Sequence, residues 1–203
     1  MARNGQELAH ALRSTIADER VLRAIAAVPR DLFVAAGQRE FAWEDEALPI
    51  AAGQTISQPT VVARMCELLE LTGSETVLDV GTGSGYHAAV LSRLAARVYS
   101  IERHADLTEG ARRALELAGV RNVTLVSGDG TRGYPAAAPY DAINVAARTD
   151  RPPPALVDQL AVGGRLVIPI GTEGQHLMRL RRTATSIERE RFEKVSFVPL
   201  ISE

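Results

Sequence analysis

The chain has 203 residues, of which 46% are hydrophobic and 24% charged, and its formal net charge is −2. These proportions exclude a disordered, collagen-like or coiled-coil chain, and the near-neutral charge offers no basic face for nucleic acid, so we expect no nucleic-acid partner. The charged N-terminus and the absence of a long apolar run predict neither an export signal nor a membrane span. The single cysteine, Cys66, suits a reducing compartment and is expected to be a small buried side chain, so we predict a cytoplasmic protein.

The first 72 residues have helical periodicity at both ends and an irregular middle. Apolar residues recur at helical spacing over residues 8–26, and Pro29 ends that helix. Residues 44–59 contain Pro, Gly and Ser without a sustained period, which predicts a loop. A second helix is predicted to begin at Pro59, with an apolar face that includes Met65 and Leu68.

Residues 73–203 alternate between strand and helix, which predicts a mostly parallel sheet covered by helices on both faces. Helices are predicted at 85–94, 107–118 and 155–160. Strands are predicted at 76–80, 98–101, 123–126, 140–145, 165–170, 175–183 and 187–200. We therefore expect one α/β domain over 1–203, in which 1–72 form a helical extension and 73–203 bind the cofactor.

A glycine loop follows the first of these strands. It comprises Gly81, Thr82, Gly83, Ser84 and Gly85. Glycines between a strand and a helix allow the backbone to approach a ligand closely. The dinucleotide pattern GxGxxG requires a third glycine at the position of Tyr86, so NAD is disfavoured. Asp79 precedes the loop and suits a ligand with an ammonium group, which points to S-adenosylmethionine (AdoMet).

Two more acidic residues follow the next two strands. Glu102 lies about 20 residues beyond the glycines, where an acid accepts the ribose hydroxyls. Asp129, followed by Gly130, can accept a hydrogen bond from the adenine amino group. Alternatively, Glu102 is a solvated acid before a helix and Asp129 a turn residue. Because the carboxyl ends of parallel strands share one edge, we expect these residues and Asp79 to form one AdoMet site.

The chain resembles the protein-L-isoaspartate O-methyltransferases, which are AdoMet-dependent, over nearly its full length. The segments that carry the resemblance are VPRDLFV (28–34), ALPIAAGQTISQP (47–59), VLDVGTGSGYHAAVL (77–91), IER (101–103), GDG (128–130), PYDAINVAA (139–147), LVDQLAVGGRLVIPIG (156–171) and FVPL (197–200). The glycine loop is common to many methyltransferases, whereas GQTISQP is close to a family signature. The resemblance implies a Rossmann-like, doubly wound, seven-stranded fold with an N-terminal helical extension.

The resemblance also implies a reaction. Such enzymes methylate the free α-carboxylate of L-isoaspartyl residues in damaged proteins, and the ester then cyclises to a succinimide, which begins repair. A carboxylate is already ionised near neutral pH, so the reaction needs no general base, and the sulfonium donor needs no metal. The four histidines, His10, His87, His104 and His176, show no metal-ligand spacing.

Ser57 is the expected catalytic residue, because its family counterpart lies beside the reacting carboxylate. Thr55 and Ile56 are expected to contribute to substrate binding, with Gln54 as a further candidate. The alternative for Ser57 is a helix cap, since serine is a preferred N-cap and a helix is predicted from Pro59.

The sequence departs from the family after the predicted strand 140–145. Arg148 and Thr149 stand where the family has small apolar residues. Arg148 either belongs to a variable solvated loop or binds an acidic group of the substrate.

Two further alternatives for the function remain: methylation of aspartate in a dedicated biosynthetic peptide, and a noncatalytic AdoMet-binding module. A monomer is expected.

Overall fold

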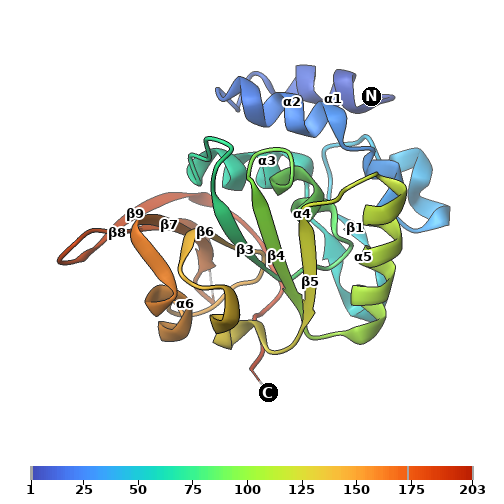
Figure 1. Cartoon of the computed structure of the whole chain (residues 1–203). Coiled ribbons are helices and arrows are strands. Elements are labelled where there is room, and N and C mark those ends of the chain that lie inside the picture. Colours follow the sequence, from blue (N-terminus) through green and yellow to red (C-terminus); the bar gives the residue numbers. More distant parts are fainter. Residues whose placement is uncertain (1, 173, 203) are drawn as a thin grey trace.

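The computed structural model describes residues 2–172 and 174–202, and within them a seven-stranded sheet has the order β5-β4-β3-β6-β7-β8-β9 (Figure 1). The strands are β3 (Thr76–Val80), β4 (Arg97–Glu102), β5 (Val123–Ser127), β6 (Tyr140–Val145), β7 (Leu160–Ile170), β8 (His176–Arg182) and β9 (Ile187–Lys194). The first five strands pair in parallel and the last two are antiparallel. The predicted mostly parallel, Rossmann-like sheet is therefore confirmed.

Helices cover both faces of this sheet. They are α1 (Gly5–Leu12), α2 (Glu19–Ala27), α3 (Pro59–Leu68), α4 (Tyr86–Leu91), α5 (Ala105–Leu117) and α6 (Pro154–Asp158). Successive residues of β3 point to opposite faces: Val77 joins the core beneath α1 to α5, whereas Leu78 joins the core that contains Leu156 of α6. The strand is apolar on both faces because both faces are covered.

The N-terminal helical segment is two helices, so the prediction of one helix over residues 8–26 was wrong. The side chain of Asp18 accepts a hydrogen bond from the backbone N–H of Arg20 and starts α2. A Cβ on Gly5 would lie 2.5 Å from the carbonyl oxygen of Ala26. The glycine therefore lets α1 and α2 pack closely side by side (Figure 1).

Four boundaries of the α/β region also differ from the prediction. The helix predicted at 155–160 ends at Asp158, and β7 begins at Leu160 instead of residue 165. Leu160 pairs with Tyr140, and the glycines at 163 and 164 fit an irregularity in the ladder. The strand predicted over 187–200 ends at Lys194, and residues 195–200 leave the sheet. The helix predicted at 85–94 spans only α4.

The predicted loop 44–59 contains regular structure. Strands β1 (Leu48–Pro49) and β2 (Thr55–Ile56) form a separate two-stranded antiparallel sheet. Between them lies the short 3-10 turn η3 (Ala51–Gly53). Further 3-10 turns are η1 (Arg30–Leu32), η2 (Ala36–Phe41), η4 (Gly130–Arg132) and η5 (Pro135–Ala137).

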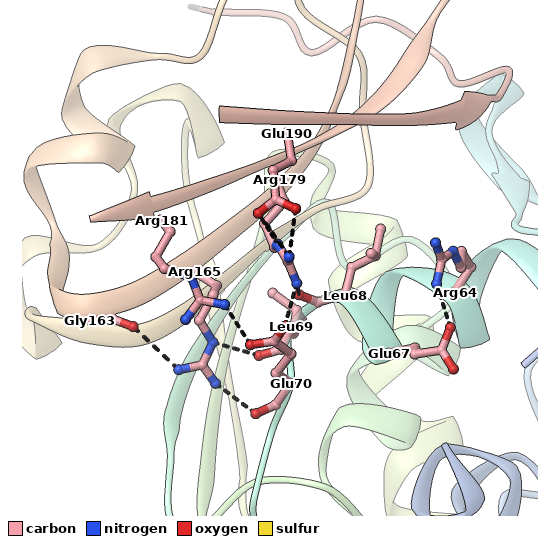
Figure 2. Close-up of polar contacts among 10 residues, drawn as sticks. All are labelled: Arg64, Glu67, Leu68, Leu69, Glu70, Gly163, Arg165, Arg179, Arg181 and Glu190. Carbon is pink, nitrogen blue, oxygen red and sulfur yellow. Dashed lines mark hydrogen bonds and ion pairs between the residues drawn. The ribbon is translucent and has the colours of Figure 1, made fainter. Parts of the chain in front are cut away.

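Arginines of β7 and β8 hold the end of α3 against the sheet (Figure 2). Arg165 donates from Nε to the carbonyl of Leu69 and from Nη2 to that of Glu70, both at 2.8 Å. Arg179 and Arg181 form ion pairs with the two carboxylate oxygens of Glu70. These cations lie where a helix leaves carbonyls unpaired. The cluster joins the first 72 residues to the C-terminal strands.

Among the described helices, none is both long and apolar enough to cross a membrane.

Candidate active site

A cleft of about 850 Å³ lies at the carboxyl edge of the sheet. It stands where the strand order reverses, because β3 lies between β4 and β6. Open α/β sheets bind ligands at such a switch point. The walls come from the loops after β3, β4 and β6, from the GQTISQP loop (residues 53–59), and from residues 198–201. We call this hollow the glycine-loop cleft.

The glycine loop after β3 forms the floor of this cleft. Gly81, Gly83 and Gly85 have positive φ angles of 93°, 54° and 88°, which side chains rarely adopt. A Cβ on Gly85 would also lie 3.1 Å from the Cβ of Ala111 in α5. Gly85 therefore allows α5 to pack closely against the start of α4. Tyr86, the next residue, is fully buried.

The two hydroxyl residues of the loop also line the cleft. Thr82 is buried, and its Oγ1 lies 2.7 Å from the hydroxyl of Ser100. The Oγ of Ser84 accepts a hydrogen bond from the backbone N–H of Tyr86 at 3.3 Å. Both hydroxyls therefore brace the loop from within the chain.

Asp79 lies behind the loop and does not line the cleft. It is fully buried; Asn144 donates to its Oδ1 at 2.8 Å and Ser100 donates to its Oδ2 at 2.7 Å. Burial, together with the nearby charge of Glu102, raises the pKa of Asp79 from 3.8 to about 6. The Asp79 carboxylate would therefore attract a cationic ligand by its charge, across the loop, without contacting it directly.

Glu102 ends β4 and lines the cleft. Its Oε2 accepts a hydrogen bond from the backbone N–H of Gly83 at 2.9 Å, and its Oε1 accepts one from that of His104 at 3.0 Å. Each carboxylate oxygen has a second lone pair, so the group can also accept from a ligand. The glycine loop thus fixes the orientation of this carboxylate.

Gly130 lines the cleft, whereas Asp129 stands just behind it. A Cβ on Gly130 would lie 2.6 Å from Cγ1 of Val80, so only glycine fits. The Oδ1 of Asp129 accepts from both the backbone N–H and the hydroxyl of Thr131. This is the turn geometry weighed from the sequence, and the adenine contact of Asp129 stays a prediction.

A second cleft, of about 910 Å³, adjoins the first. Its lining includes Gln58, Val61 and Phe197. Thr55, Ser57, Ala146 and Val198 line both clefts. Ile56, predicted with its neighbours, is buried and reaches only the glycine-loop cleft. The structure therefore brings Thr55 and Ser57 to the junction of the two clefts.

Ser57 does not cap α3. The N-cap residue is Gln58, and Asp45 performs the capping: its Oδ1 accepts from the backbone N–H of Thr60 at 2.8 Å and its Oδ2 from the side chain of Gln58 at 3.1 Å. Within the described part of the chain, no group hydrogen-bonds to the Ser57 hydroxyl. That hydroxyl is half-buried and available to a ligand.

Like Asp79, Gly85 and Asp129, the predicted site residue Arg148 lines neither cleft. Its backbone instead anchors the C-terminal segment: its N–H donates to the carbonyl of Val198 at 2.9 Å, and its carbonyl accepts from the N–H of Leu200 at 2.8 Å. The role of its side chain in substrate choice stays a prediction.

Sequence reasoning missed the C-terminal wall of the cleft. Residues 198–201 line it, although residues 198–200 were predicted to belong to the strand 187–200. Pro199 was the available signal, since proline is a poor strand residue away from edges and bulges. The residues missed from other elements are Val62, Val80, Tyr86, His87, Ile101, Arg103, His104, Ala146 and Ala147.

His87 is buried in contact with the Asp79 network. Its Nδ1 accepts from Asn144 at 3.2 Å, and its Nε2 lies 3.5 Å from the sulfur of Cys66. Burial lowers the pKa of His87 to about 3 and raises that of Cys66, so both groups are neutral near pH 7. Among the described residues, no group of three or more His, Cys, Asp or Glu is placed to hold a metal ion.

Comparison with known proteins finds one family over almost the whole chain. The profile of the family described as "Protein-L-isoaspartate(D-aspartate) O-methyltransferase (PCMT)" matches residues 3–203. Protein-L-isoaspartate O-methyltransferase 2 of Pelobacter propionicus is 53% identical over 189 residues, which cover 92% of this chain and 84% of that protein. Protein-L-isoaspartate O-methyltransferase 1 of Geotalea uraniireducens is 51% identical over 195 residues, or 95% of this chain and 89% of that protein.

Two solved structures are similar along the chain. One protein-L-isoaspartate O-methyltransferase has a TM-score of 0.88 at 29% identity; the match covers 96% of this chain and 65% of that longer one. A Plasmodium falciparum structure assigned to the same activity, in complex with S-adenosyl-L-homocysteine, has a TM-score of 0.85 at 27% identity and matches 100% of both chains.

Proposed function

Since the chain belongs to the protein-L-isoaspartate(D-aspartate) O-methyltransferase family, we propose that it transfers a methyl group from AdoMet to the free α-carboxylate of L-isoaspartyl residues in damaged proteins and peptides. The products are the methyl ester and S-adenosylhomocysteine. The ester then loses methanol as the neighbouring amide nitrogen closes the succinimide ring, and hydrolysis of that ring returns some normal aspartyl peptide.

The observation that carries this proposal is the junction of the two clefts. Thr55 and Ser57 lie in the walls of both, and a methyl transferase needs the acceptor oxygen and the methyl donor to meet at one point. Holding reactants in that geometry can supply several kcal/mol of the barrier. We assign the glycine-loop cleft to AdoMet and the second cleft to the isoaspartyl peptide.

Ser57 acts on the acceptor. A carboxylate with an ordinary pKa of about 3.5 is ionised near neutral pH and attacks without a general base. The Ser57 hydroxyl donates a hydrogen bond to one oxygen of this carboxylate and orients the other. Because the hydroxyl is uncharged, it replaces water without weakening the nucleophile as a cation would. Thr55 and Ile56 shape the wall beside it, the former polar and the latter apolar.

The residues of the glycine-loop cleft fit AdoMet, which supplies an electrophilic methyl group on a sulfonium. Glu102 accepts from the ribose hydroxyls, and Asp79 contributes negative charge towards the cationic donor. The glycine loop, with Thr82 and Ser84, admits the amino-acid part at close range. Gly130 leaves room for the adenine, and Asp129 accepts from its amino group.

Methyl transfer from labelled AdoMet to an isoaspartyl peptide tests this function, with the matching normal aspartyl peptide as control. We expect transfer to the isoaspartyl peptide only. No transfer to that peptide would refute repair, and a rate on the normal peptide at least as large would instead support a dedicated biosynthetic substrate. Titration with NADH is expected to show no binding.

Ser57→Ala tests the role of the hydroxyl. We expect AdoMet affinity to stay within about threefold, because the hydroxyl faces the acceptor, while methyl transfer falls by about a hundredfold. Thr60→Ala, which changes a hydroxyl outside both clefts, is the matched control. A large loss of AdoMet affinity in Ser57→Ala would contradict the assignment.

We further propose that the enzyme acts as a monomer in the cytoplasm. A near-neutral charge suits an enzyme that meets damaged proteins of any charge, and its one cysteine is buried. Size-exclusion chromatography with light scattering tests the monomer.

A further inference from the structure

The guanidinium of Arg30, in the turn η1, is the largest charged group in the core. The residue is 0% exposed. Among the ion pairs of the described residues, none includes Arg30. An unpaired buried cation is costly unless other groups replace its water, and burial lowers the pKa of Arg30 accordingly. Such a group calls for an explanation beyond packing.

Backbone carbonyls take the place of that water. Nη1 donates to the carbonyl of Ala42 at 2.6 Å, and Nη2 donates to those of Glu46 at 2.9 Å and Ser57 at 3.1 Å. A weaker contact reaches Glu44 at 3.5 Å. The Arg30 side chain therefore connects the segment 42–46 to Ser57, the residue whose hydroxyl we assign to the acceptor.

The face of the same guanidinium lies against the glycine-loop side of the site. Its central carbon is 5.5 Å from the ring centroid of Tyr86, within the range of cation–π attraction. Tyr86 is the first residue of α4, directly after Gly85, and it lines the glycine-loop cleft. The ring of Phe33 also packs against that of Tyr86, at a centroid distance of 5.8 Å.

We propose that Arg30 is a positioning residue that fixes the Ser57 backbone relative to the glycine loop, and so sets the approach of the acceptor carboxylate to the methyl donor. The inference rests on the proposed function. It requires arginine specifically: the planar fork reaches carbonyls on two segments, residues 42–46 and Ser57, while its face stacks on a ring, and a lysine ammonium can do only part of this.

Arg30→Lys tests the proposal, with Arg165→Lys as the matched control. Arg165 also donates to two backbone carbonyls and also joins the N-terminal region to the rest. Its partners Leu69 and Glu70 line neither cleft, whereas Ser57 and Tyr86, the partners of Arg30, do. We expect both variants to lose thermal stability. Only Arg30→Lys should lower kcat for the isoaspartyl peptide, by about tenfold to a hundredfold, while the Kd for AdoMet stays within a few-fold.

Hydrogen exchange of the intact protein provides a readout that does not depend on turnover. In Arg30→Lys without AdoMet, amides of residues 54–58 should exchange faster than in the wild type, whereas Arg165→Lys should leave them unchanged. If the wild type transfers no methyl group but this exchange pattern holds, the proposed function fails and the positioning contact stands.

Equal losses of kcat in the two variants, or unchanged exchange at 54–58 in Arg30→Lys, would overturn the proposal. If Arg30→Lys does not fold at the assay temperature, Phe33→Leu replaces it. That change loosens the Tyr86 stack and leaves the carbonyl contacts. A lower kcat with AdoMet affinity retained supports the proposal, and an unchanged kcat refutes it.

Discussion

Replacing Asp79 by asparagine should stabilise the protein while weakening its cofactor site. The side chain is fully buried, and asparagine has nearly the same shape. In Asp79→Asn, the amide oxygen would keep the hydrogen bond from Asn144, and the amide nitrogen would donate to the hydroxyl of Ser100. Ser100 could then donate to Thr82, whose hydroxyl lies 2.7 Å away. No buried polar group would lose its partner.

The magnitude follows from the pKa of Asp79. Burial raises this pKa from 3.8 to about 6. Each pKa unit corresponds to about 1.4 kcal/mol, so keeping the carboxylate ionised costs the folded state up to about 3 kcal/mol well above pH 6. Because the folded pKa is the higher one, the aspartate's contribution to stability is fully present below pH 3.8 and is lost as the pH rises through about 6.

Denaturant unfolding of wild type and Asp79→Asn across this pH range checks the reasoning. We expect Asp79→Asn to be more stable by about 1–3 kcal/mol near pH 8, and the difference to vanish near pH 4. Calorimetric titration at the higher pH should show weaker AdoMet binding, since the variant lacks a negative charge near a cationic ligand. A variant that is less stable at both pH values, or a difference independent of pH, would refute the electrostatic argument.

Three further substitutions probe other parts of the structure. Gly85→Ala should destabilise the fold by about 2 kcal/mol in denaturant unfolding, because it combines a positive φ with a Cβ only 3.1 Å from that of Ala111; a neutral effect would contradict the close packing. Arg179→Met should lower stability by about 1–2 kcal/mol and leave one cooperative transition, because it removes a partner of the Leu68 carbonyl and of Glu70 at the α3 end and of Glu190 in β9; two separate transitions would contradict the single domain that we propose over residues 1–203. Arg148→Ala should lower kcat/KM for isoaspartyl peptides if the side chain shapes substrate choice, and an unchanged value would assign this residue to the solvated loop.

The sheet and the glycine loop could be predicted because local patterns determine them. The buried run at 76–80 and the strand at 140–145 coincide with β3 and β6. Their sequences are mostly apolar, and strand–helix alternation leaves little choice of topology. The boundaries that failed depend on distant partners. β7 begins early because Leu160 pairs with Tyr140, and α2 begins anew because Asp18 caps it.

The cofactor residues were harder to place than to identify. The sequence puts Asp79, Glu102 and Asp129 near one edge of the sheet, and they are there. Whether each carboxylate faces the cleft depends on which backbone and side-chain donors compete for it. Glu102 lines the cleft, whereas Ser100 and Asn144 hold Asp79 behind the loop.

The loop that carries Ser57 shows why the acceptor side resists prediction from local pattern. A serine two residues before a helical proline has the pattern of a cap, yet Asp45 takes that role from the preceding loop. Arg30 binds the Ser57 carbonyl across 27 positions of sequence. Because two distant side chains satisfy the backbone around Ser57, its hydroxyl is left for a ligand. A functional hydroxyl of this kind is therefore recognised because other side chains make the backbone hydrogen bonds that it could have made. Those side chains are distant in sequence, so only the folded structure identifies them.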